Sequence, residues 1–180
     1  MSLWGNSDAD EAKPKWLTEA DKKLTYATAR GWVYKKSANH QEEVIAAIGA
    51  LATSIGQADI TDIEWVTTAF DKSDGGTLSV KVIFNEKVTV TGTPQLTVVN
   101  DTNANHTLSY ASGSTSNELT FSLAIAAGNA ATSAGDVLSI GANAVSLNSG
   151  TIVDTSEGGN ATITSSAGIG TAAGTITVAA

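Results

Sequence analysis

The side chains that most often perform nucleophilic and metal chemistry are scarce in this sequence. Its 180 residues include no cysteine, which excludes a thiolate nucleophile, a disulfide framework and cysteine-ligated zinc or iron–sulfur sites. The two histidines, His40 and His106, have no nucleophile or second metal ligand at a fixed spacing, and His106 lies in an asparagine-rich stretch where exposure is ordinary. No catalytic constellation is left, so the sequence predicts a protein that is not an enzyme.

Carboxylates near the ends of expected strands are the next candidates, because calcium binds such oxygen ligands. Asp136, Asp154 and Glu157 occupy these positions. Tight calcium binding needs about six or more oxygens that converge on one point, whereas these three side chains come from separate turns. We therefore expect solvated turn carboxylates, and neither a metal nor a cofactor.

A glycine pattern near the C-terminus has the outline of a dinucleotide-binding loop. Gly168, Gly170 and Gly174 supply the glycines, but a strand-like Thr-Ile-Thr segment follows them. The nucleotide would require a helix N-terminus there to hold its pyrophosphate. We expect a tail or a glycine-containing strand in place of a nucleotide site.

Large aromatic side chains are candidates for binding a partner. All four tryptophans lie in the first 65 residues, and the early aromatics stand at wide intervals along a polar stretch. An indole buries a large area at low entropic cost, so such residues can anchor a segment in pockets on another surface. We predict that Trp4, Trp16, Tyr26 and Trp32 bind a partner; the alternative is that they pack on their own domain.

The segment that carries these aromatics, residues 1–58, is expected to be an irregular arm with short elements. Thr18 and Asp21 form a capping box that predicts one or two helical turns, and residues 31–34 have the composition of a short strand. Residues 39–56 place apolar side chains at the spacing of an amphipathic helix. This favours a helix there, with a buried strand as the alternative.

From residue 60 onward the periodicity of apolar residues changes to two, which is typical of half-buried strands. Phe84 and Phe121 both follow this alternation, so we expect their rings to face the core and Lys81 to face solvent. Runs of this kind recur between turn clusters, at residues 78–84, 88–90, 96–98, 108–110, 119–123, 137–140, 145–147 and 152. Many short strands at this spacing predict a mainly β protein, an antiparallel β-sandwich.

Charge is distributed unevenly along the chain. Residues 1–58 contain seven basic and seven acidic side chains, whereas residues 59–180 contain three basic and eleven acidic ones, so the net charge of −8 belongs to the second part. No lysine or arginine follows Lys87, which argues against binding to nucleic acid. The longest apolar run is too short to span a bilayer, and the start lacks a secretion signal, so we expect no membrane partner.

Three stretches of the second part resemble the immunoglobulin-like repeats of bacterial surface adhesins and phage virion proteins. They are residues 82–96 (VIFNEKVTVTGTPQL), 110–121 (YASGSTSNELTF) and 150–154 (GTIVD), and the resemblance extends over residues 60–165. The opening MSLWGNSDAD, with KPKW at 13–16 and GWV at 31–33, is similar to the start of virion structural proteins in T4-like phages of marine bacteria.

The break in charge places a boundary near residue 58, with an N-terminal attachment segment at 1–58. The resemblance implies an immunoglobulin-like sandwich at residues 59–165, followed by a tail or last strand at 166–180. It implies a virion structural protein on the particle surface, as capsid decoration or a neck or tail component. The expected partners are the major capsid protein or other virion proteins, then host surface glycans and further copies of the chain. The alternative is an adhesin module of a bacterial cell surface, which would predict further repeats and a secretion signal.

Overall fold

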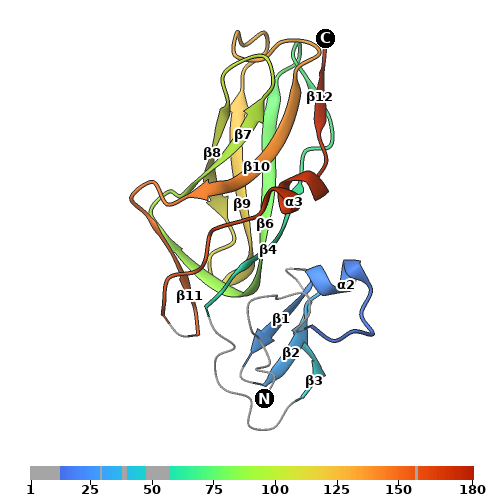
Figure 1. Cartoon of the computed structure of the whole chain (residues 1–180), viewed down its shortest axis with the longest axis vertical. Coiled ribbons are helices and arrows are strands. Elements are labelled where there is room, and N and C mark those ends of the chain that lie inside the picture. The colour runs from blue at the N-terminus through green and yellow to red at the C-terminus, as the bar shows by residue number, and fades with distance from the viewer. Residues whose placement is uncertain (1–12, 29, 38–39, 48–56, 157) are drawn as a thin grey trace.

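The structure of the chain, a computed structural model, describes residues 13–28, 30–37, 40–47, 57–156 and 158–180. It is mainly β and contains two separate sheets, one of three strands and one of nine. We term the described residues of 13–47 the small unit and those of 57–180 the large unit. Figure 1 shows the small unit at one end of the large unit and the C-terminus at the opposite end.

The small unit consists of a short helix and a three-stranded antiparallel sheet. Its elements are α2 (Glu19–Lys23), β1 (Thr25–Thr28), β2 (Gly31–Tyr34) and β3 (Glu43–Ala46). The helix begins as the capping box predicts, because the hydroxyl of Thr18 accepts a hydrogen bond from the backbone N–H of Asp21 at 3.1 Å. The strand predicted at 31–34 is confirmed as β2, which is the central strand of this sheet.

The helix favoured for residues 39–56 is wrong where the structure describes that segment. Residues Glu43–Ala46 form β3, and Val44 pairs with Val33 of β2. β-branched side chains suit a strand, and β2 offers an unpaired edge, which the spacing of apolar residues cannot reveal. Residues 40–42 and 47 are described and belong to no helix, whereas residues 39 and 48–56 lie outside the described residues.

The nine strands of the large unit belong to one sheet. They are β4 (Ile60–Trp65), β5 (Phe70–Asp71), β6 (Gly76–Thr91), β7 (Gln95–Asn100), β8 (His106–Ser112), β9 (Ser116–Ile125), β10 (Val137–Ser146), β11 (Thr151–Asp154) and β12 (Ile176–Ala179). Their order is β11-β6-β9-β8-β7-β10-β12-β5, and β4 also pairs with β6. β5 and β12 pair in parallel, whereas the other pairs are antiparallel.

The apolar alternation of these strands supplies the core, as predicted. Phe84 and Phe121 are fully buried, and Phe121 packs edge-on against Tyr110 with ring centroids 6.1 Å apart. Lys81 lies on the opposite face of β6 and pairs with Glu118 of β9 at 3.0 Å. The predicted register of both phenylalanines is therefore confirmed.

Two strands are longer than the sequence pattern indicates. The runs at 78–84 and 88–90 both belong to β6, and those at 137–140 and 145–147 belong almost entirely to β10. In each case the register of pairing shifts within the strand, between residues 83 and 88 of β6 and between 140 and 145 of β10. Such irregularities break the alternation of side chains while the strand continues, so one strand looks like two in the sequence.

The C-terminal residues, given above as a tail or a last strand, pair and pack with the rest of the large unit. The expected last strand is confirmed as β12, whose Ile176 and Val178 are buried between β10 and β5. The glycine-rich segment before it forms a helix, α3 (Ala167–Ala172), in place of a tail or strand. A Cβ at Gly170 would lie 2.1 Å from the backbone oxygen of Ile140, so glycine allows α3 to approach β10 this closely.

Candidate functional site at the junction of the two units

The alternation of β4 places two carboxylates on its outer face. Ile63 is fully buried, so its neighbours Asp62 and Glu64 lie on the opposite face. The small unit supplies the matching cation, since α2 ends at Lys23. The Lys23 ammonium lies 2.8 Å from Oδ2 of Asp62 and 2.5 Å from Oε1 of Glu64. We term Lys23, Asp62 and Glu64 the Lys23 cluster.

The electrostatics of the Lys23 cluster follow from these contacts. Hydrogen bonds to Asp62, and then to Glu64, raise the pKa of Lys23 above its ordinary value, although partial burial opposes them. A cation in the last turn of a helix also interacts favourably with the helix dipole. Lys23 is therefore held charged at the junction.

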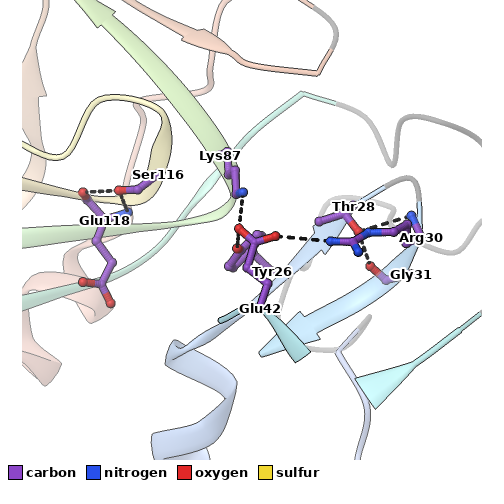
Figure 2. Close-up of polar contacts among 8 residues, drawn as sticks. All are labelled: Tyr26, Thr28, Arg30, Gly31, Glu42, Lys87, Ser116 and Glu118. Carbon is purple, nitrogen blue, oxygen red and sulfur yellow. Dashed lines mark hydrogen bonds and ion pairs between the residues drawn. The ribbon is translucent and has the colours of Figure 1, made fainter. Parts of the chain in front are cut away.

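A second cluster joins the units in the opposite sense, with the cation on the large unit. Figure 2 shows Lys87 of β6 directed toward Glu42, which precedes β3. The two form an ion pair, and the Lys87 ammonium lies 5.0 Å from the ring centroid of Tyr26 in β1. The Tyr26 hydroxyl donates to Oε1 of Glu42 at 2.5 Å, and Arg30 reaches Oε2 at 3.4 Å. We term Tyr26, Arg30, Glu42 and Lys87 the Lys87 cluster.

The Lys87 cluster fixes the protonation of its two acidic members. Hydrogen bonds from Lys87, and then from Tyr26, lower the pKa of Glu42. Burial, and then the hydrogen bond to Glu42, raise the pKa of Tyr26. At neutral pH the cluster thus contains a carboxylate and a neutral phenol.

The turn between β1 and β2 positions Arg30 for this cluster. The Thr28 hydroxyl donates to the backbone oxygen of Gly31 at 3.0 Å and accepts from the backbone N–H of Arg30 at 3.2 Å (Figure 2). Gly31 has a φ of +118°, and a Cβ there would lie 2.0 Å from the backbone oxygen of Ala46. The turn therefore requires glycine at this position.

An open polar cleft lies beside the Lys23 cluster, with a volume of about 850 Å³. Its walls come from both units, and α3 forms part of the wall on the large unit. The charged residues that line it are Lys13, Glu19, Lys22, Lys23, Asp62 and Glu64, and Trp65 contributes an indole. Small-molecule sites are usually lined by apolar side chains, so this balanced set of charges does not resemble one.

The structure separates the four residues predicted to bind a partner. Trp16 is 70 % exposed and stands just before α2. Tyr26 and Trp32 are buried in the small unit, which corresponds to the alternative that aromatics pack on their own domain. Trp4 lies outside the described residues. Trp16 is thus the described member of the set whose ring is exposed.

The expectation that Asp136 is a solvated turn residue is wrong. Its carboxylate is buried and accepts hydrogen bonds from Thr102 at 2.5 Å, Asn100 at 2.7 Å, Asn103 at 2.9 Å and the backbone N–H of Ser133 at 2.8 Å. Burial raises the pKa of Asp136, but these hydrogen bonds outweigh it and hold the pKa well below its ordinary value. Through these hydrogen bonds Asp136 connects the loop after β7 with the loop before β10.

Asp154 is also buried, contrary to expectation. Its Oδ1 accepts from the backbone N–H of Ser156 at 2.7 Å, and the Ser156 hydroxyl lies 2.6 Å from that oxygen and 3.2 Å from Oε2 of the buried Glu86. This arrangement connects β6 with the end of β11. Glu157, the third predicted carboxylate, lies outside the described residues.

The two histidines occupy different environments and are not in contact with each other. His40 is exposed, with its Nδ1 2.8 Å from the Ser37 hydroxyl. His106 is buried at the start of β8, 3.4 Å from the Thr132 hydroxyl, so the expectation of an exposed loop position is wrong. Burial lowers its pKa, against an opposing effect of Asp136.

The pairing of residues across the junction has no local signal in the sequence. The outward alternation of Asp62 and Glu64 was visible as a pattern, but nothing in the sequence pointed to Lys23 as their partner. Glu42 and Lys87 are 45 positions apart, so their pairing has no local signal.

Comparisons with other proteins do not assign a role to the site. Comparison of the chain with protein-family models, with curated proteins and with solved structures finds no match. Within the part of the chain that the structure describes, no group of three or more histidine and carboxylate side chains is arranged to hold a metal. Nor do the described residues include a helix long and apolar enough to cross a membrane.

Proposed function

We propose that this chain is a non-enzymatic structural protein of a phage particle. The small unit attaches it to the major capsid protein or to another virion protein. The large unit, an immunoglobulin-like β-sandwich, projects from the particle surface as capsid decoration or as a neck or tail component.

Strand order supports the immunoglobulin-like part of this proposal. β7, β8 and β9 are neighbours in sequence and in the sheet, and β6 lies beside β9. This is the order of a Greek key, whose connections are typical of immunoglobulin-like sandwiches. The stretches at 82–96 and 110–121, which resemble the repeats of adhesins and virion proteins, lie almost entirely on these strands and their turns.

The observation that carries the attachment role is the exposure of Trp16. At 70 % exposure its indole leaves a large apolar surface in water, and burial in a pocket on a partner would remove that surface. Tryptophan is enriched among the residues that dominate binding energy at protein interfaces. Trp16 belongs to the small unit, and the C-terminus lies at the far end of the large unit (Figure 1).

Charge supports an outward orientation of the large unit. The net charge of −8 belongs to residues 59–180, so copies attached side by side repel one another through their large units. Such repulsion favours exposure to solvent over close packing. Contact with host surface glycans is a further role that we propose for this surface.

Co-sedimentation with particles tests attachment through Trp16. Particles made without this protein are mixed with wild-type chain, with Trp16→Ala, and with Val66→Ala as control, because Val66 is 51 % exposed on the large unit. We expect Trp16→Ala to weaken binding by about 30-fold, which corresponds to about 2 kcal/mol, and Val66→Ala to bind as wild type. Equal binding of all three proteins would reject Trp16 as the anchor.

The alternative, a module of a bacterial surface adhesin, is supported by the same sequence resemblance. It predicts that the chain is found on cells without phage and is missing from purified particles. Mass spectrometry of gradient-purified particles distinguishes the two locations.

A further inference from the structure

We propose that the small unit is a releasable module, held on the large unit by two reciprocal lysine clusters that salt can open while both units stay folded. This inference concerns the junction and does not depend on the proposed function.

The first observation is that lysines and carboxylates are exchanged between the two units. Lys23 of the small unit binds Asp62 and Glu64 of the large unit, whereas Lys87 of the large unit binds Glu42 of the small unit. Each unit thus contributes one lysine to the junction and binds the lysine of the other unit through its carboxylates. The two clusters together resist rotation as well as separation, because they hold the small unit at two different strands, β4 and β6.

The partial exposure of these groups makes them sensitive to salt. The side chains of Lys23 and Lys87 are 40 % and 32 % exposed, and that of Glu42 is 23 % exposed. Dissolved ions screen interactions between charges in such positions, whereas they act much less on fully buried pairs.

Separation of the two apolar cores is the second observation. Among the described residues, the buried hydrophobic side chains of the small unit are Tyr26, Trp32 and Val33, and none of them belongs to the core cluster of the large unit. Beside the Lys23 cluster the units are divided by the polar cleft. No continuous apolar core therefore spans the part of the junction that the structure describes.

Each unit keeps its internal contacts when the junction opens. In the small unit Glu42 retains the Tyr26 hydroxyl and Arg30 as partners, and the three-stranded sheet pairs only with itself. In the large unit β4 remains paired with β6. Opening therefore disrupts the two lysine clusters and leaves both sheets intact.

Energy transfer between two dyes measures the opening directly. The chain has no cysteine, so thiols introduced as Lys36→Cys in the small unit and Ala104→Cys in the large unit, both exposed, are labelled without background. Single molecules are recorded from about 10 mM to about 1 M NaCl, which shortens the screening length from about 30 Å to about 3 Å. We expect the ratio of open to closed molecules to rise about tenfold over this range.

Charge variants test whether the two lysines are responsible. The double variant Lys23→Gln/Lys87→Gln is expected to show at low salt the distribution that the wild type reaches at high salt. Lys81→Gln is the matched control, because Lys81 pairs with Glu118 inside the large unit at similar exposure. It should behave as wild type.

The folding of both units is followed in the same samples, by circular dichroism and by hydrogen exchange of β1 and β2. The proposal is overturned if energy transfer between the dyes is the same in the double variant, in high salt and in the wild type at low salt. A change in energy transfer that is accompanied by faster hydrogen exchange in β1 and β2 also overturns the proposal. That result would show that the small unit unfolds and is not released as a folded module.

Discussion

The small and large units stabilise their folds in different ways. The large unit buries a continuous apolar cluster drawn from β4 to β12, in which Phe84 and Phe121 are fully enclosed. The described part of the small unit buries three hydrophobic side chains and adds a network of hydrogen bonds around Glu42. Because apolar burial is the dominant favourable contribution to folding, the large unit should hold most of the stability.

Truncation gives the largest expected effect and tests whether the large unit is independent. We expect residues 57–180 to fold without the small unit, because their core is complete. Residues 57–165 should fail to fold, since they lack β12, whose Ile176 and Val178 fill the space between β10 and β5. Circular dichroism and thermal melts compare the two fragments. A cooperative melt of 57–165 would show that the C-terminal residues are dispensable.

Removal of one core ring tests the apolar cluster of the large unit. Phe84→Ala leaves a cavity and should lower the free energy of unfolding by about 3 to 5 kcal/mol. Lys81→Ala, on the opposite face of the same strand, loses a partly exposed ion pair and should cost about 0 to 1 kcal/mol. Urea denaturation of the full chain measures both. Similar losses for the two variants would contradict the assigned register.

Acid should weaken the loop contact of the large unit at Asp136. The pKa of this carboxyl is lowered in the folded state, so its stabilisation is present above its ordinary value of 3.8 and is lost as pH falls through the folded value. Asp136→Asn should lower the melting temperature at neutral pH, and the gap to wild type should narrow below about pH 4. Asp74→Asn, an exposed turn variant, controls for the lost charge. A difference in melting temperature between wild type and Asp136→Asn that does not change with pH would contradict the predicted role of the Asp136 charge.

The strand alternation of the large unit was predictable because it is a local property of the sequence. Period two placed Phe84 and Phe121 in the core, and a capping box placed the start of α2 at Thr18. Contacts between distant residues were not predictable in this way. The buried position of Asp136 depends on Asn100, Thr102 and Asn103, which approach it through the pairing of β7 with β10.

The small unit was less predictable because its elements depend on partners. Residues 43–46 are a strand since β2 pairs with them, although their apolar spacing also fits a helix. The Lys87 cluster brings together four segments from both units, so no single window of sequence contains its geometry. Exposure of Trp16 and burial of Trp32 could likewise not be told apart from residue type alone.

Loss of one hydroxyl gives the smallest expected effect and locates stability within the small unit. Tyr26→Phe removes the hydrogen bond to Glu42 but keeps the ring, so it should destabilise the small sheet by about 1 kcal/mol. Amide exchange in β1 and β2 should then accelerate about fivefold, while exchange in the core of the large unit stays unchanged. Tyr110→Phe is the matched control, since its hydroxyl accepts from the backbone N–H of Ser114 at 2.7 Å inside the large unit. Accelerated exchange in both units after Tyr26→Phe would mean that they unfold together. That result would contradict the conclusion that the two units have separate cores.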